Sequence, residues 1–265
     1  MSDQTPAERV FVGVDLTAGA RAITLVTLNV RQRIVTRAET DFAGAVEAVS
    51  AYARVVCAVD APQTRNAGLM ADPDYRAGLG LPPNGATYSN YKVCEYELRR
   101  RGIGLYNTPR DADAAPAWMH LGWRFYAALE AAGFVTWPEP GARQVFEVHP
   151  HACFTVMLER RPFRKLSLEG RLQRQMALYR AGVGVPSPME FLEEITPHRL
   201  LIGDLDTHGL LLDHDMLDAA VAAHTAWLAA SDPARVTSVG NPAEGVIVLP
   251  TAALKDRYPR GGRGA

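Results

Sequence analysis

The sequence predicts an α/β fold with a mixed five-stranded sheet, in the order β-β-β-α-β-α-β-α with helical insertions. Three segments with strand patterns follow one another through short turns, which predicts an antiparallel meander. A segment of helical period then leads into a continuously apolar run, which predicts a crossover helix and a strand buried on both faces. The meander covers residues 10–15, 22–29 and 33–40, the helix covers 42–53, and the buried strand covers 54–62.

Two aspartates lie at the ends of two of these predicted strands. Asp15 closes the first strand, and Asp60 lies near the end of the buried strand. A strand reached through a crossover helix runs parallel to the strand it joins, so both carboxylates are expected side by side at one edge of the sheet. An ionised carboxylate there is partly desolvated and needs a partner such as a metal ion, an Arg or backbone amides. The alternative for each is a turn residue that accepts backbone N–H groups.

The rest of the chain is mostly helical, with short strands at 144–148 and 245–249 and further helices at 113–133 and 213–230. Residues rich in Gly, Pro, Asn and Arg predict a long functional insertion over the sheet edge. We therefore expect a single domain with two insertions and two tails. The domain covers 10–250, its insertions lie at about 63–110 and 152–205, the N-terminal tail covers 1–9, and a flexible C-terminal tail covers 251–265.

Composition limits the class of protein. Of the 265 residues 48% are apolar, and the formal net charge of -1 predicts neither a nucleic-acid binder nor a membrane-surface protein. Three scattered cysteines fit a reducing compartment and argue against a disulfide framework. The N-terminus lacks a signal-peptide pattern, and no apolar run is long enough to span a bilayer. We expect a cytoplasmic protein without membrane contact, and composition sets no oligomeric state.

Five short motifs, in order along the chain, carry a family resemblance. From about Val10 to Pro250 the chain resembles the family catalogued as domain of unknown function 429, described as predicted nucleases of ribonuclease H-like fold. The resemblance implies a ribonuclease H-like sheet and a metal-dependent nuclease. The motifs are Val12-Gly13-Val14-Asp15, Val59-Asp60-Ala61-Pro62, Cys94-Glu95 with Leu98-Arg99, Phe146-Glu147-Val148-His149-Pro150-His151-Ala152, and Leu217-Asp218-Ala219-Ala220 with Ala223 and Thr225-Ala226.

Nucleases of this fold use clustered carboxylates to hold two divalent metal ions, Mg²⁺ or Mn²⁺, roughly 4 Å apart. The resemblance implies that Asp15, Asp60 and Asp218 are metal ligands and catalytic residues. Asp215 lies three residues before Asp218 on the same helical face, an arrangement similar to that of Holliday-junction resolvases. The alternative for Asp215 is a helix-dipole role. Glu147 is a further candidate ligand or base, or else an outward-facing strand residue.

Candidate substrate-binding residues lie in the segments that follow the strand ends. The Arg side chains could bind phosphate, and the His side chains could donate to phosphate or act as bases. The alternatives are an ion pair between Arg99 and Glu95 and a helix-entry turn at the two histidines. A zinc site there is not expected, because its ligands would crowd one segment. The candidates are Arg65, Asn66, Glu95, Arg99, His149 and His151.

The leading expectation is a metal-dependent phosphodiesterase that acts on nucleic acid or a small phosphoester by a two-metal carboxylate mechanism. One alternative is a nucleotide-binding phosphotransferase of the actin-like group, whose phosphate loop is matched in part by Asp15-Leu16-Thr17-Ala18-Gly19. The other is a non-catalytic binding protein on the same fold, in which Asp15 and Asp60 would be tied to Arg or Lys side chains.

Overall fold

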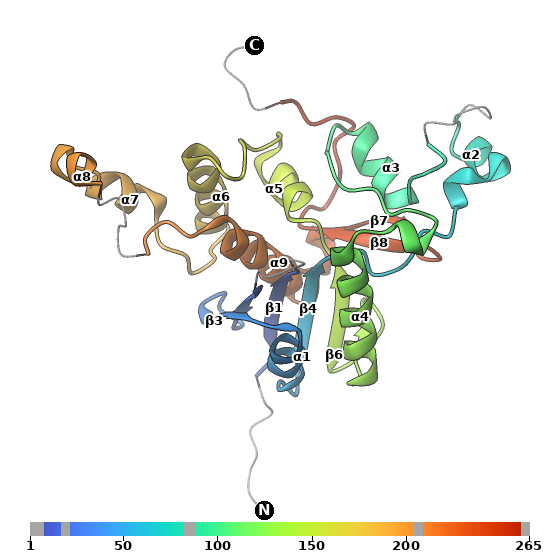
Figure 1. Ribbon diagram of the computed structural model, residues 1–265, viewed down its shortest axis with the longest axis horizontal. Coiled ribbons are helices and arrows are strands. Elements are labelled where there is room, and N and C mark those ends of the chain that lie inside the picture. Colours follow the sequence, from blue (N-terminus) through green and yellow to red (C-terminus); the bar gives the residue numbers. More distant parts are fainter. Residues whose placement is uncertain (1–7, 17–21, 82–87, 204–208, 261–265) are drawn as a thin grey trace, which may run out of the picture.

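The computed structural model describes residues 8–16, 22–81, 88–203 and 209–260. Its strands are β1 (Val10–Asp15), β2 (Ile23–Leu28), β3 (Ile34–Thr40), β4 (Val55–Asp60), β5 (Val135–Thr136), β6 (Arg143–Glu147), β7 (Thr237–Asn241) and β8 (Gly245–Leu249). They form one mixed sheet in the order β3-β2-β1-β4-β6-β8-β7, and β5 pairs with β6. The sheet lies at the centre of the molecule (Figure 1).

The α/β class and the antiparallel meander are confirmed, and β4 runs parallel to β1 as the crossover predicts. The prediction of five strands is wrong, because the described residues form a sheet of eight. The two-residue β5 is too short to leave a pattern. The pattern of β7 is also weak, because Val239 is its one buried apolar residue and its sequence has no apolar alternation.

Helices cover both faces of the sheet. Helices α1 (Phe42–Ser50) and α4 (Ala117–Ala131) lie on one face, and α5 (Pro150–Leu158), α6 (Leu168–Arg180) and α9 (His214–Ser231) lie on the other (Figure 1). In the described part of the chain, no helix has the length and apolar character needed to cross a membrane. The remaining helices are α2 (Pro73–Gly78), α3 (Val93–Arg100), α7 (Pro188–Glu194) and α8 (Pro197–Ile202), with 3-10 turns η1 (Leu69–Ala71), η2 (Ala112–Ala114) and η3 (Pro233–Arg235).

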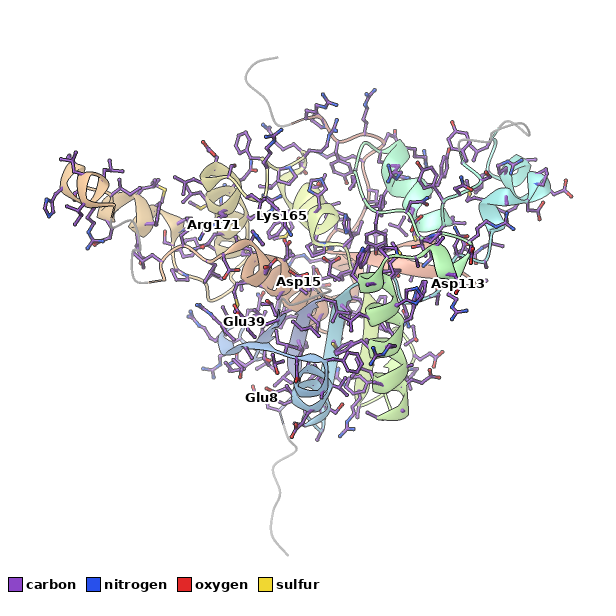
Figure 2. All side chains as sticks on the ribbon, viewed as in Figure 1. Glu8, Asp15, Glu39, Asp113, Lys165 and Arg171 are labelled. Atoms are coloured by element: carbon purple, nitrogen blue, oxygen red, sulfur yellow. The ribbon has the colours of Figure 1, made fainter. Side chains whose placement is uncertain are left out.

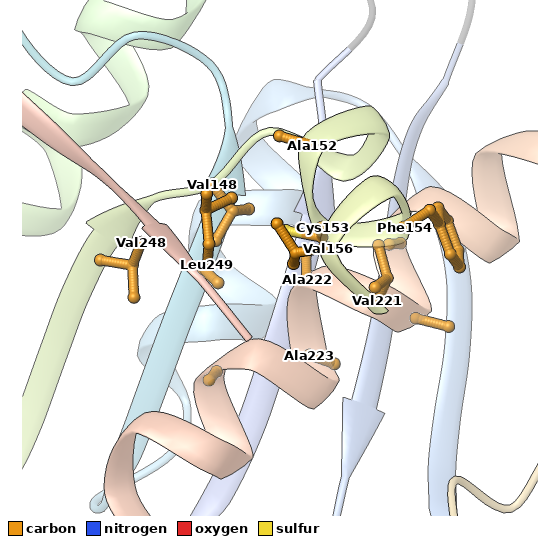
Figure 3. Packing of buried hydrophobic residues seen from close by; sticks show 14 of the residues in the cluster. Val148, Ala152, Cys153, Phe154, Val156, Val221, Ala222, Ala223, Val248 and Leu249 are labelled. Atoms are coloured by element: carbon orange, nitrogen blue, oxygen red, sulfur yellow. The ribbon is translucent and has the colours of Figure 1, made fainter. Parts of the chain in front are cut away.

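Helix α9 lies directly on β1, and small residues at the contact allow this close approach. Ala222 and Ala223 are fully buried and pack in the layer between α9, α5 and the sheet (Figure 3). A Cβ atom on Gly13 would lie 1.9 Å from the carbonyl oxygen of Ala219, so any larger residue at position 13 would push the helix away. The contact brings Asp218, in the second turn of α9, to the carboxyl end of β1.

The C-terminal segment 251–260 packs against the body of the molecule, so the predicted flexible tail does not begin at residue 251. Tyr258 is 2% exposed, and its backbone N–H donates to the carbonyl of Arg101. The backbone N–H of Arg161 donates to the carbonyl of Pro259. The tail prediction rests on the local content of Gly and Arg, which carries no information about these long-range contacts. Residues 1–7 and 261–265 lie outside the described residues.

Candidate active site

Asp15 and Asp60 are direct neighbours at the carboxyl ends of β1 and β4. The parallel register pairs the two residues, so their side chains leave the same face of the sheet. Asp15 is 5% exposed, whereas the Asp60 side chain is 21% exposed. The structure therefore places the two carboxylates side by side, and their catalytic role stays a prediction.

The Asp15 carboxylate is in an environment that disfavours its negative charge. Burial, followed by the negative charges of Asp60 and Asp218, raises the pKa of Asp15 to about 9. Its Oδ2 atom is buried, and no hydrogen-bond partner for it exists among the described residues. A buried polar atom without a partner carries a free-energy cost that a bound cation would relieve.

Asp218 lies close to this pair and is held by a lysine. The Nζ atom of Lys165, on the segment between α5 and α6, lies 2.8 Å from Oδ2 of the buried Asp218. Lys165 also opposes the pKa shift of Asp15, which places its charge near that carboxylate. Figure 2 shows Asp15 beside α9 at the end of β1, with Lys165 near it. Asp215 contributes less directly, because its Oδ1 atom lies 2.6 Å from Nδ1 of His214.

Lys165 is a residue of the site that sequence reasoning missed. It follows a proline-containing turn and fits no strand or helix pattern, so nothing local links it to Asp218, 53 residues later. One weak signal exists, because the chain has only three lysines, Lys92, Lys165 and Lys255. Two of these three pair with buried carboxylates.

A pocket of about 400 Å³ opens beside these residues. Asp60 and Asp218 form an acidic part of its lining. The basic part of the lining consists of His149, His151, Arg164, Lys165 and Arg174. The pocket thus presents carboxylates and cationic groups to the same space, which suits a ligand that carries both a metal ion and phosphate oxygens.

The two candidate histidines lie in this pocket. The Nδ1 atom of His149 is 3.6 Å from Oδ1 of Asp60, and the His149 ring packs edge-on against Tyr106. Burial, followed by the electrostatic effect of the neighbouring His149, lowers the pKa of His151 to about 4. His151 is therefore a neutral imidazole at pH 7, with one ring nitrogen that donates a hydrogen bond and one that accepts.

Glu147 faces away from the aspartate pair. It pairs in register with Val59, so its side chain leaves the opposite face of the sheet from that of Asp60. Its Oε1 atom accepts a hydrogen bond of 2.7 Å from the Tyr106 hydroxyl, and its Oε2 atom lies 3.8 Å from the Lys92 ammonium. The alternative of an outward-facing residue is not what the structure shows, because Glu147 is fully buried. These contacts indicate a structural role for Glu147 on the face of the sheet away from the aspartate pair.

Glu95 and Asn66 hold the insertion together. Glu95 is fully buried, burial raises its pKa to about 7, and its Oε1 atom accepts from the backbone N–H of Thr108. The side-chain amide of Asn66 donates to the carbonyl oxygen of the same Thr108 at 2.9 Å. Both side chains are thus engaged by the protein itself.

The two candidate arginines stack on aromatic rings. The Arg65 guanidinium lies 5.4 Å from the centre of the Trp123 ring, and that of Arg99 lies 4.8 Å from the centre of the Tyr91 ring. Arg99 also donates to the carbonyl of Leu105 rather than pairing with Glu95. Neither arginine lines the pocket beside Asp60.

The expected three-carboxylate metal centre stays a prediction, and its three aspartates differ in what contacts them. Over the described ranges, no group of three or more His, Cys, Asp or Glu side chains is placed to hold a metal ion. Asp218 is engaged by Lys165, whereas the Oδ2 atom of Asp15 has no partner within those ranges and lies next to Asp60. Mg²⁺ keeps several waters and is commonly bound through one or two carboxylates, so the aspartate pair fits this ion.

The sequence left two alternatives open, a phosphotransferase of the actin-like group and a non-catalytic binding protein. Residues 17–19 of the partial phosphate loop lie outside the described residues. For a non-catalytic protein, Asp15 and Asp60 are expected to be tied to Lys or Arg. Among the ion pairs of the described residues, none joins a Lys or Arg to either aspartate.

Comparison with known protein families identifies the family of this chain. Residues 13–244 match the family described as "Protein of unknown function (DUF429)". The chain belongs to the DUF429 family. The part matched by DUF429 includes Asp15, Asp60 and Asp218, so the whole acidic cluster lies within it. Searches of curated proteins and of solved structures found no match.

Proposed function

We propose that this DUF429 protein is a metal-dependent phosphodiesterase whose divalent cation, Mg²⁺ or Mn²⁺, is held by Asp15 and Asp60. The observation that carries the proposal is the buried Oδ2 atom of Asp15, which has no partner among the described residues and lies next to Asp60 in register. Two adjacent carboxylates, one of them deeply buried, attract a cation strongly.

A bound cation in such a site polarises a phosphoryl oxygen and lowers the pKa of a coordinated water. The residues of the chain supply the remaining functions. The His149 imidazole lies beside Asp60 and lines the pocket, so it can accept a proton from an attacking water. Arg164 and Lys165 line the same pocket and can bind phosphate oxygens through charge-assisted hydrogen bonds.

The size of the pocket favours a small substrate. Its volume of about 400 Å³ lies in the range of small-ligand pockets, which suits one nucleotide unit or a small phosphoester. A net charge of -1 does not attract a long polyanion from a distance. Recognition therefore depends on the local lining of the pocket, in which Arg164, Lys165 and Arg174 are cationic and the neutral His151 can donate a hydrogen bond.

The test is hydrolysis of structured and single-stranded DNA and RNA, and of a small synthetic phosphodiester, with Mg²⁺, with Mn²⁺ or with EDTA. We expect metal-dependent cleavage that falls about 100-fold or more in Asp15→Asn and in Asp60→Asn, the scale typical for removal of a preorganised polar group from an active site. Asp113→Asn is the matched control, because Asp113 is exposed and lies far from Asp15 (Figure 2). Cleavage that is the same in both site variants as in the wild type would overturn the proposal.

A further inference from the structure

We propose that Lys165 takes the place of a second metal ion, so that the site of this protein works with a single divalent cation. This inference rests on the proposed function and deepens it. It departs from the two-metal arrangement that the family resemblance implies, and it assigns a role to a residue that no sequence motif singled out.

The ammonium group of Lys165 contacts the third carboxylate of the site. The Nζ atom of Lys165 lies 2.8 Å from Oδ2 of Asp218, a short charge-assisted contact with a side chain that is almost fully buried. Lys165 also lines the pocket together with Asp60. The ammonium therefore lies at Oδ2 of Asp218, beside the pocket that both residues line, and it occupies the position that a second metal ion bound through Oδ2 would take.

The carboxylates of the site differ in whether their oxygens are free to bind a metal ion. Oδ2 of Asp15 is buried and unpartnered over the described residues, so the pair of Asp15 and Asp60 can accept one cation without breaking any contact to that atom. The Oδ2 atom of Asp218, by contrast, already accepts from the Lys165 ammonium, so a metal ion at that oxygen would compete with Lys165. No third His, Cys, Asp or Glu joins these groups in a complete metal site within the described part of the chain.

The charges of the site also favour a single divalent cation. Ionised Asp15, Asp60 and Asp218 together carry three negative charges. Lys165 balances one of them through its contact with Asp218, and a single divalent cation balances the other two. With Lys165 in place, a second divalent cation would leave the cluster with two excess positive charges next to the basic lining of the pocket, and without Lys165 with only one, so the lysine disfavours binding of the second cation.

The Lys165 ammonium can also contact the substrate during the reaction. A lysine has three N–H donors, and Asp218 accepts from one of them. The other two can donate to a phosphate oxygen or to the leaving oxygen in the pocket. Lys165 would thus stabilise the negative charge that a second metal ion stabilises in the two-metal mechanism.

The experiment counts metal ions directly. Mn²⁺ is titrated into the metal-free protein by isothermal titration calorimetry, and free Mn²⁺ is measured in parallel by electron paramagnetic resonance. We expect one Mn²⁺ per chain in the wild type and in Lys165→Arg, which keeps the positive charge. In Lys165→Ala, Asp218 is released and a second Mn²⁺ is expected to bind.

Matched controls separate this inference from the proposed function. Lys255→Ala removes an exposed lysine that pairs with Glu159, and it should keep one Mn²⁺ per chain. Circular dichroism melts confirm that each variant is folded. Two ions in the wild type, or one ion in folded Lys165→Ala, would overturn the role of Lys165 and leave the proposed function standing. No bound Mn²⁺ in the wild type would overturn the proposed function itself.

Discussion

At the scale of single residues, Asp15 combines burial with two nearby carboxylates. The strand register places its side chain at the end of β1, on the same face of the sheet as that of Asp60. Burial and the neighbouring charges both favour its neutral form, and the free Oδ2 atom has no donor to compensate among the described residues. In the metal-free protein this arrangement reduces stability, as is common for functional sites.

Because the buried Asp15 carboxylate lowers the free energy of unfolding, we expect Asp15→Asn to stabilise the metal-free protein at pH 8. The folded pKa of Asp15, about 9, lies above its unfolded value near 3.8. Between these values the unfolded state binds fewer protons than the folded state, so wild-type stability falls as pH rises. The variant lacks this dependence and should be more stable at pH 8 by on the order of 2 kcal/mol, with a smaller difference at pH 5.

The measurement is urea denaturation in EDTA at the two pH values. Glu8→Gln is the control, because Glu8 is an exposed carboxylate far from Asp15 (Figure 2), and it should change stability little at either pH. A variant Asp15→Asn that is less stable than the wild type at pH 8 would contradict the prediction, as would a gain that does not depend on pH.

At the scale of secondary structure elements, the contact between α9 and β1 sets the geometry of the site. Asp213 caps the helix by accepting the backbone N–H of Met216, which fixes where α9 begins. Asp218 follows in the second turn, and the alanines after it allow the helix to lie on β1. The helix therefore delivers Asp218 to the end of β1 because Gly13 leaves room for it.

Gly13→Ala should therefore destabilise the protein strongly. The added Cβ would lie 1.9 Å from the carbonyl oxygen of Ala219 and 2.4 Å from the backbone nitrogen of Ala223. Backbone atoms cannot rotate away, so the helix must shift, at a cost of about 3 kcal/mol or more. Urea denaturation should show this loss in free energy of unfolding.

Gly78→Ala provides the control for that substitution. A Cβ at position 78 meets no atom within 4 Å, and the residue lies in α2. Alanine is favoured over glycine in a helix, so this variant should be as stable as the wild type or slightly more stable. If Gly13→Ala unfolded at the same urea concentration as the wild type, the close approach of α9 to β1 would not be required.

The insertion is a second element whose position depends on buried charge. Glu244, in the turn between β7 and β8, is fully buried and accepts the backbone N–H groups of Gly68, Leu69 and Val93. These hydrogen bonds tie η1 and the start of α3 to the turn that joins the last two strands. A buried carboxylate that accepts several N–H groups makes a strong anchor, which holds the insertion at this edge of the sheet.

At the scale of the whole molecule, the C-terminal segment connects parts that are far apart in sequence. Tyr258 lies in the larger apolar core, and its backbone binds the carbonyl of Arg101 at the end of α3. Pro259 accepts from the backbone N–H of Arg161, after α5. The segment thus joins both insertions near the end of the described chain.

Tyr258→Ala should destabilise the whole protein, because it leaves a cavity in a core shared by the sheet and both insertions. A loss of about 3 kcal/mol in the free energy of unfolding is expected for removal of a buried aromatic side chain. Leu201→Ala is the control, since Leu201 is 87% exposed on α8. Equal unfolding midpoints for the two variants, measured in urea, would show that the C-terminal segment contributes nothing to the core.

The sequence by itself determined the first half of the sheet and the position of the aspartate pair. Alternating and continuous apolar patterns are local, and the parallel crossover follows from general rules of chain connection. These two facts are enough to predict that Asp15 lies beside Asp60, as the register of β1 and β4 confirms. The motif around Asp218 added the third carboxylate through family resemblance.

Only the tertiary structure decided what surrounds these carboxylates. It paired Asp218 with Lys165, turned Glu147 to the opposite face and buried Tyr258. It also added β7, whose residues carry no apolar alternation. The physical reason is the same in each case, because these contacts join residues distant in the chain, and their energies depend on packing and register that leave no periodic trace in the sequence.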